Sequence, residues 1–103
     1  MNQQLLKQLK KMQEEMIQTQ KEIENTVFTA STSGIVTVGV YGTKEIESIK
    51  IDDSFEVESK EDLEMLAEMI IAACRQAYRE IDKTTEEKMS KFNSFLGGMN
   101  PFI

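Results

Sequence analysis

The stretch that decides the fold is Gly34–Asp52, "GIVTVGVYGTKEIESIKID", because it is the most strand-like part of a chain of 103 residues. Its β-branched residues alternate with others, so that Val36, Val38 and Val40 share one face, as a half-buried strand requires. The glycine in "YGTK" indicates one turn, and the preceding "STSG" indicates another. We therefore predict three short antiparallel strands within residues 26–52.

The facing of the two outer strands follows less directly from the pattern. In the third strand, simple alternation places Ile49 and Ile51 on one face and Ile46 on the opposite one. In the first strand, "TVFTAS", small and polar residues occupy both faces, and the buried face is left open.

Long helical patterns flank these strands on both sides, over residues 2–25 and residues 60–92. The first has apolar or weakly polar residues at alternating spacings of four and three, which is a heptad seam. The seam residues are Leu5, Leu9, Met12, Met16, Thr19 and Ile23. Ser59 and Asp62 resemble a capping box at the start of the second helix, with Asp in place of Glu or Gln. Residues 1–92 are predicted to form one domain, and residues 93–103 a flexible tail.

The lengths of these elements predict a homodimer. A chain of this size should have a radius of gyration of about 13 Å, whereas the second helix should be about 45 Å long. Its outer half and the first seam therefore need a cover, which a second copy would supply. A monomer with a frayed second helix is the alternative. The predicted interface consists of Leu5, Leu9, Met12, Met16, Val36, Val38, Val40 and Ile70.

Composition and motifs argue against an enzyme. The chain has no histidine and one cysteine, Cys74, so a Cys/His zinc cluster cannot form. No phosphate-binding glycine loop or nucleophile elbow occurs, and the acids after the third strand lack the spacing of an EF-hand. We expect no catalytic residue, metal, cofactor or small-molecule substrate. No apolar run approaches the length of a membrane span, and the default location is cytoplasmic.

The charge of the chain is negative overall but uneven. The net charge is −6, which argues against a uniformly basic nucleic-acid binder. Between Glu45 and Glu68, however, ten acids face only Lys50 and Lys60, so this stretch alone carries −8 and the remainder +2. A basic surface can therefore exist on the flanking helices.

Three groups of basic residues lie on those helices. Arg75, Arg79 and Lys83 recur every fourth residue and so form a stripe that could follow a phosphate backbone. The other bases are Lys7, Lys10 and Lys11 in the first helix and Lys88 and Lys91 near the end of the second. The alternative is a set of solvated faces with intrahelical ion pairs, such as Arg79 with Asp82. Spacing alone favours that alternative.

Several stretches together resemble one family. "LLKQLKKMQEEMIQTQKEIENT", "SGIVTVGVYGTKEIESIKID", "EDLEMLAEMIIAACRQAYREI" and "EEKMSKF" are similar, in this order, to segments of the YbaB/EbfC nucleoid-associated proteins. The resemblance implies an α+β subunit of α-β-β-β-α order and a tweezer-like homodimer whose projecting helices grip duplex DNA. It places Lys7, Arg79, Lys88 and Lys91 where family members often carry bases. The "YGTK" turn departs from the family's usual Asn-Gly or Gly-x-Gly, which leaves the turn type open.

The sequence therefore predicts a bacterial, nucleoid-associated protein that binds duplex DNA as a homodimer. Binding should be weak to moderate and sensitive to salt, because the contacts are mainly to phosphate. An effect on transcription or chromosome organisation is a further expectation from the resemblance. The alternative function is a protein–protein interaction module whose paired helices grip a partner chain through apolar and methionine contacts.

Overall fold

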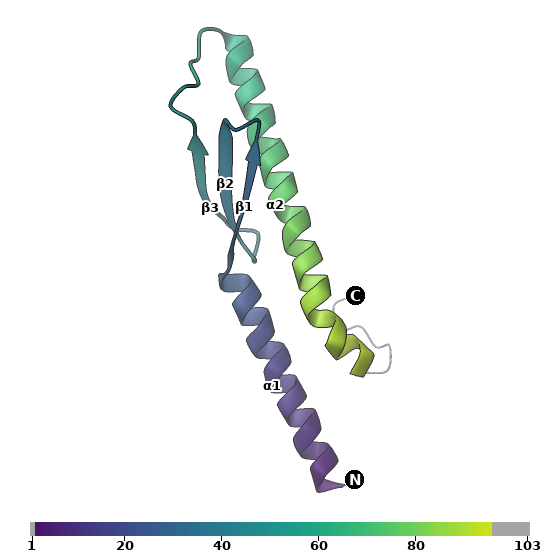
Figure 1. Cartoon of the computed structure of the whole chain (residues 1–103). Helices are drawn as coiled ribbons and strands as arrows, with labels where there is room; N and C mark the ends of the chain where they lie inside the picture. Colours follow the sequence, from purple (N-terminus) through teal and green to yellow (C-terminus); the bar gives the residue numbers. More distant parts are fainter. Residues whose placement is uncertain (1, 96–103) are drawn as a thin grey trace.

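The computed structural model describes residues 2–95 of the chain. Five elements follow one another in the predicted α-β-β-β-α order (Figure 1), which confirms the α+β fold. They are α1 (Gln3–Asn25), β1 (Val27–Thr32), β2 (Val36–Tyr41), β3 (Ile46–Ile51) and α2 (Lys60–Phe95). Helix α2 extends three residues beyond the predicted end at residue 92. The rest of the predicted flexible tail lies outside the described residues.

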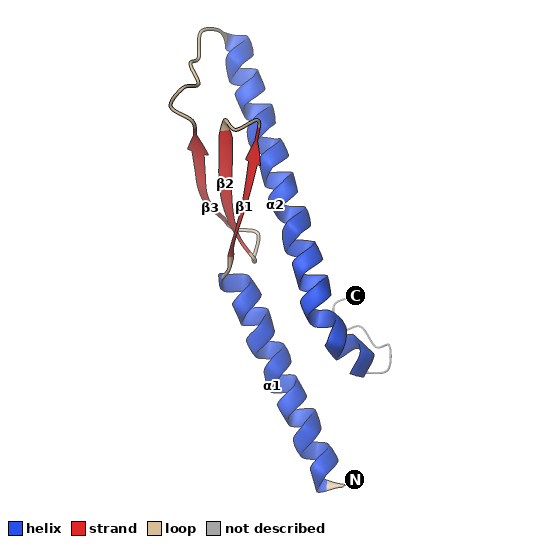
Figure 2. Ribbon diagram, viewed as in Figure 1, coloured by secondary structure: helices blue, strands red, loops and turns tan. Residues whose placement is uncertain are grey.

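The three strands form one antiparallel sheet in the order β1-β2-β3 (Figure 2). The turn between β1 and β2 is closed by a hydrogen bond of 3.0 Å from the Ile35 N–H to the Thr32 carbonyl oxygen. Its two central residues, Ser33 and Gly34, have φ angles of 55° and 66°. Positive φ at both central residues is the geometry of a type I′ hairpin turn, whose twist matches that of the strands.

Helix α2 covers one face of the sheet, over β1 and β2. The three alternating valines of β2, Val36, Val38 and Val40, have no exposed surface beneath it. On α2, Ala73 and Ala77 are equally buried, and their small side chains let the helix approach the strands closely. The valines therefore belong to the core of a single chain. We remove these three positions from the predicted dimer interface, because they offer no surface to a partner.

Strand β3 differs from the predicted alternation because of a β-bulge opposite Gly39 and Val40. Val38 pairs with Ile49, but Val40 pairs with Ile46 instead of the residue that regular alternation would require. The extra residue turns Ile46 onto the same face as Ile49 and Ile51. The prediction that Ile46 lies on the opposite face was therefore wrong.

The three isoleucines of β3 form an exposed apolar strip, because α2 passes over the other two strands. We call Ile46, Ile49 and Ile51 the β3 ledge; their exposed fractions are 44%, 43% and 43%. The ledge continues the buried face of the sheet, yet nothing in the described part of the chain covers it.

The two helices meet only over part of their lengths, and the molecule is elongated. Ile23 near the end of α1 is buried, as are Met89 and Phe92 on α2, outside the sheet core. Beyond this junction the N-terminal part of α1 extends past the end of α2 (Figure 1). The molecule measures 71 × 21 × 16 Å, with a radius of gyration of 19.5 Å. We refer to α1 and to α2 from Arg75 onward as the helical arms.

Candidate nucleic-acid interface

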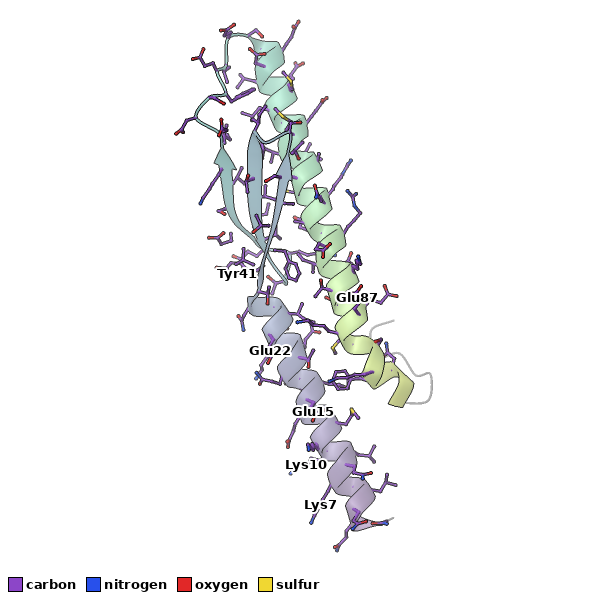
Figure 3. All side chains as sticks on the ribbon, in the orientation of Figure 1. Lys7, Lys10, Glu15, Glu22, Tyr41 and Glu87 are labelled. Carbon is purple, nitrogen blue, oxygen red and sulfur yellow. The ribbon has the colours of Figure 1, made fainter. Side chains whose placement is uncertain are left out.

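The first group of predicted DNA-binding residues lies on the free part of α1. Lys7, Lys10 and Lys11 are all exposed, and Figure 3 shows Lys7 and Lys10 near the tip of the arm. At about 100° per residue, these three lysines lie on the side of α1 opposite Leu9 and the other seam residues. The tip of the arm, as far as Lys11, is therefore amphipathic, with one basic and one apolar face.

The second group forms a row along the solvent side of α2. Arg75, Arg79 and Lys83 are exposed, whereas Ala77 and Ile81 between them face the sheet core. Eight residues of helix separate the ends of the row, a distance of about 12 Å. The structure therefore brings these three bases together on one face, as their spacing predicted. We call them the α2 row.

The third group, Lys88 and Lys91, does not continue the α2 row. Both lysines line a shallow groove between the two arms, together with Thr19, Glu22 and Glu87. Figure 3 shows Glu22 on α1 and Glu87 on α2 at this level. The Lys91 ammonium also lies 4.8 Å from the centroid of the Phe92 ring. Two carboxylates beside these lysines offset part of their positive charge.

The eight predicted DNA-binding residues form no salt bridge within residues 2–95. In that part of the chain the one ion pair joins Lys44 Nζ to Asp82 Oδ1 at 2.9 Å. Asp82 therefore pairs with Lys44 in the β2–β3 turn. It does not form the intrahelical ion pair with Arg79 that the alternative interpretation of the basic residues requires. The charges of the α2 row are therefore available to a phosphate backbone.

The acidic residues gather toward the other end of the molecule. The solvent side of α2 carries Glu61, Glu64 and Glu68 before the α2 row begins. In the preceding loop, hydrogen bonds from the hydroxyl and backbone N–H of Ser54 hold the pKa of Asp52 below its ordinary value. The negative charge is therefore concentrated at the loop end, whereas the arms carry acidic and basic residues in nearly equal numbers.

The apolar positions of the predicted dimer interface have different surroundings. Leu5 and Leu9 are 43% and 37% exposed on the free part of α1. Met12 and Met16 are half-buried, and Ile70 is partly buried against the sheet core. The β3 ledge was not among the predicted positions, since its exposure depends on the bulge and on the path of α2.

One further basic residue of α1, Lys21, is not among the predicted DNA-binding residues. It is exposed and lies two heptads after Lys7, so the two lysines share one side of the helix. That spacing was the signal available in the sequence. Among the described residues, no group of histidine, cysteine or acidic side chains could hold a metal ion. No helix in that part of the chain has the length and apolarity needed to cross a bilayer.

The fold and the site define a class of protein, a small α+β subunit whose two helical arms carry basic residues that form no salt bridge within residues 2–95. The model of the YbaB/EbfC DNA-binding family matches residues 1–96. A protein of Agathobacter rectalis named "Nucleoid-associated protein" is 42% identical over 95 residues, covering 91% of this chain and 82% of that protein. A Clostridium novyi protein, also named as nucleoid-associated, is 43% identical over 97 residues. The match covers 93% of this chain and 81% of that protein.

A solved structure shares the same fold. The crystal structure of an uncharacterized protein from Helicobacter pylori is 28% identical, with a TM-score of 0.64, over 92% of this chain and 98% of that one. This chain belongs to the YbaB/EbfC DNA-binding family, and the resemblance inferred from its sequence is confirmed.

Proposed function

We propose that this protein is a nucleoid-associated protein that binds duplex DNA as a homodimer, through basic residues on its helical arms. Family membership and the names of the relatives support DNA as the partner. The observation that carries the proposed contact surface is the α2 row, whose three bases share one face and have no salt bridge within residues 2–95. We assign no catalytic role to the chain.

Contacts from such a surface go mainly to phosphate. The α2 row spans about 12 Å along the helix, and each DNA strand carries one charge for about every 3.4 Å of its axis. The row can therefore meet more than one phosphate of a strand. Acids at the loop end repel the duplex, which orients the arms toward it during approach. The net charge of −6 weakens binding overall, and the contacts to phosphate make binding sensitive to salt.

A second copy of the chain is the proposed cover for the exposed apolar surfaces. The β3 ledge extends a buried sheet face, and the Leu5–Leu9 side of α1 is uncovered as well. Exposed apolar surface of this kind is typical of protein–protein contact sites. A two-fold dimer would bury both surfaces and place two pairs of arms on one assembly. The proposed interface comprises Leu5, Leu9, Met12, Met16, Ile70 and the three ledge residues.

The test is charge reversal on the α2 row. The double variant Arg79→Glu and Lys83→Glu should abolish binding to a duplex at low salt, measured by fluorescence anisotropy. The matched control is Lys50→Glu with Lys60→Glu, which changes the net charge equally at the loop end and should weaken binding far less. Equal loss in both variants would assign the effect to net charge and contradict the proposed surface. No binding by the folded wild-type protein at low salt would overturn DNA binding itself.

The exposed leucines of α1 also favour the alternative, a grip on a partner protein. Such a grip relies on apolar contact, so it should survive reversal of Arg79 and Lys83. Replacing Leu5 and Leu9 with glutamine should abolish it. Loss of DNA binding on charge reversal therefore separates the two functions.

A further inference from the structure

The β2–β3 turn, residues 42–45, contacts both helical arms. We propose that this turn is the joint that fixes the angle between α1 and α2, and that Gly42 is a positioning residue for DNA binding. The DNA-binding part of this inference rests on the function proposed above. The geometric part, the arm angle, stands on the contacts of the turn alone.

Gly42 sits directly against the end of α1. Its N–H donates a hydrogen bond of 3.0 Å to the carbonyl oxygen of Thr26, the residue that follows α1. The Thr26 N–H in turn donates to the Ile23 carbonyl oxygen at 3.1 Å, and the Thr26 hydroxyl to the Glu22 carbonyl oxygen at 2.6 Å. The last turn of α1 is thereby connected to the β2–β3 turn through backbone groups.

Only glycine leaves room for this contact. A Cβ atom at position 42 would lie 1.9 Å from the Ile23 carbonyl oxygen and 2.5 Å from its carbonyl carbon. Both are backbone atoms of a helix end, which cannot move aside as a flexible side chain would. Among residues 2–95 the glycine with positive φ is Gly34 and not Gly42. Gly42 is therefore required for space and not for an unusual backbone conformation.

The other side of the turn contacts the middle of α2. Lys44 Nζ lies 2.9 Å from Asp82 Oδ1 and 5.8 Å from the centroid of the Tyr78 ring. The turn itself is closed by hydrogen bonds from Lys44 N–H to the Tyr41 carbonyl oxygen at 2.7 Å and from Tyr41 N–H to the Glu45 carbonyl oxygen at 2.8 Å. Because Lys44 and Asp82 are 45% and 67% exposed, this ion pair is the weaker of the two contacts.

A small rotation at the joint is amplified at the tip of α1. The helix has 23 residues and a length of about 34 Å, so a tilt of about 10° moves its tip by about 6 Å. Lys7, Lys10 and Lys11 lie near that tip. Because neighbouring phosphates of a strand are spaced by a few ångströms, such a movement takes these lysines from one phosphate to another. The contact at Gly42 thus controls which phosphates both arms can reach together.

The arm angle can be measured as a distance between two spin labels. The labels are placed on Gln4→Cys in α1 and Gln76→Cys in α2, both exposed, in a Cys74→Ala background. Labelled chains are diluted with unlabelled ones, so that electron–electron double resonance reports distances within one chain. The test variant is Gly42→Ala. The matched control is Gly34→Ala in the other turn, where a Cβ meets nothing within 4 Å but the positive φ is strained.

We expect Gly42→Ala to shift the mean distance between the labels by several ångströms, and Gly34→Ala to leave it unchanged. Circular dichroism establishes that each variant is folded. An unchanged distance distribution in folded Gly42→Ala would overturn the inference. If Gly42→Ala does not fold, Lys44→Gln decides: a broader distribution supports the joint, and an unchanged one contradicts it.

Duplex binding is measured on the same proteins. Gly42→Ala should bind DNA at least tenfold more weakly than Gly34→Ala, because its arms no longer match the spacing of the phosphates. Unchanged affinity in a variant whose label distance has shifted would contradict the positioning role. If the wild-type protein fails to bind DNA, the proposed function fails, while the label distances still decide the joint.

Discussion

Ser59 and Asp62 exchange two hydrogen bonds at the start of α2. The Asp62 carboxylate accepts from the Ser59 N–H at 3.2 Å, and the Ser59 hydroxyl accepts from the Asp62 N–H at 3.3 Å. The Glu58 N–H donates to the same carboxylate at 2.9 Å. This confirms the predicted capping box, with Asp in the position usually held by Glu or Gln.

Loss of this cap should destabilise the fold. Replacing Asp62 with alanine leaves N–H groups of Ser59 and Glu58 without their acceptor and should lower the free energy of unfolding by about 1 kcal/mol. Asp62→Asn, which keeps an acceptor oxygen, should lose less. Urea denaturation followed by circular dichroism measures both variants. Equal stability of Asp62→Ala and wild type would show that the cap contributes nothing to folding.

The β1–β2 turn can be improved. Ser33 has a φ of 55°, a conformation that asparagine tolerates better than serine, and Asn-Gly is the preferred type I′ pair. We expect Ser33→Asn to raise the free energy of unfolding by about 0.5–1 kcal/mol. The matched control is Thr43→Asn in the other turn, where φ is not positive and no gain is expected. Thermal unfolding compares the two, and a gain confined to Thr43→Asn would contradict the assigned turn geometry.

A charge on the β3 ledge should dissociate the proposed dimer. Ile49 is exposed in the single chain, so Ile49→Lys should leave the fold intact while burying an unpaired charge in the interface. Sedimentation equilibrium at tens of micromolar should show dimers for wild type and monomers for the variant. Thr29→Lys, on the opposite face of the sheet, serves as the control and should remain dimeric. A dimeric Ile49→Lys protein would exclude the ledge from the interface.

The salt dependence of DNA binding reports how many basic side chains contact phosphate. Each of Arg75→Gln, Arg79→Gln and Lys83→Gln should reduce the slope of log affinity against log salt by about one for each contact removed. Lys60→Gln, at the acidic end, should leave the slope unchanged. The slope is measured by titrating one duplex at several salt concentrations. An unaltered slope in all three variants would show that the α2 row does not touch phosphate.

Asp52 should contribute to stability in a pH-dependent manner. Because hydrogen bonds from Ser54 lower its pKa in the native state, the unfolded chain binds this proton more readily than the folded one. The contribution is therefore present above the ordinary pKa of 3.8 and is lost as the pH falls through the lowered native value. Ser54→Ala should be less stable than wild type at neutral pH. The difference should shrink in denaturation experiments below pH 3.8, and a difference that grew there would contradict the assignment.

The sequence predicted the elements of the fold but not which surfaces they leave uncovered. Alternation identified Val36, Val38 and Val40 as one apolar face, and that face is fully buried. Alternation does not reveal whether the cover comes from the same chain or from a partner. The predicted sheet face of Ile46 was wrong because a β-bulge lies between β2 and β3. A bulge depends on how two strands pair, which the sequence of one strand does not encode.

The arrangement of the basic residues in the proposed DNA-binding surface was predictable from the sequence only over short helical spacings. Arg75, Arg79 and Lys83 keep the four-residue spacing that holds side chains on one face, and the structure places them there. Lys88 comes five residues after Lys83 and is turned about 140° around the axis, so it faces the groove between the arms instead. The ion pairs of the charged residues were less predictable, because the pair of Asp82 with Lys44 joins residues that are distant in sequence.

The elongated shape governs how the protein behaves in solution. A body of 71 × 21 × 16 Å experiences more friction than a sphere of the same mass, and it tumbles slowly about its two short axes. A single chain would therefore leave a sizing column early, at the volume of a larger globular protein. Elution volume alone would then report a dimer even where one chain is present. The subunit count of this rod must come from a measurement of mass, by light scattering or sedimentation equilibrium.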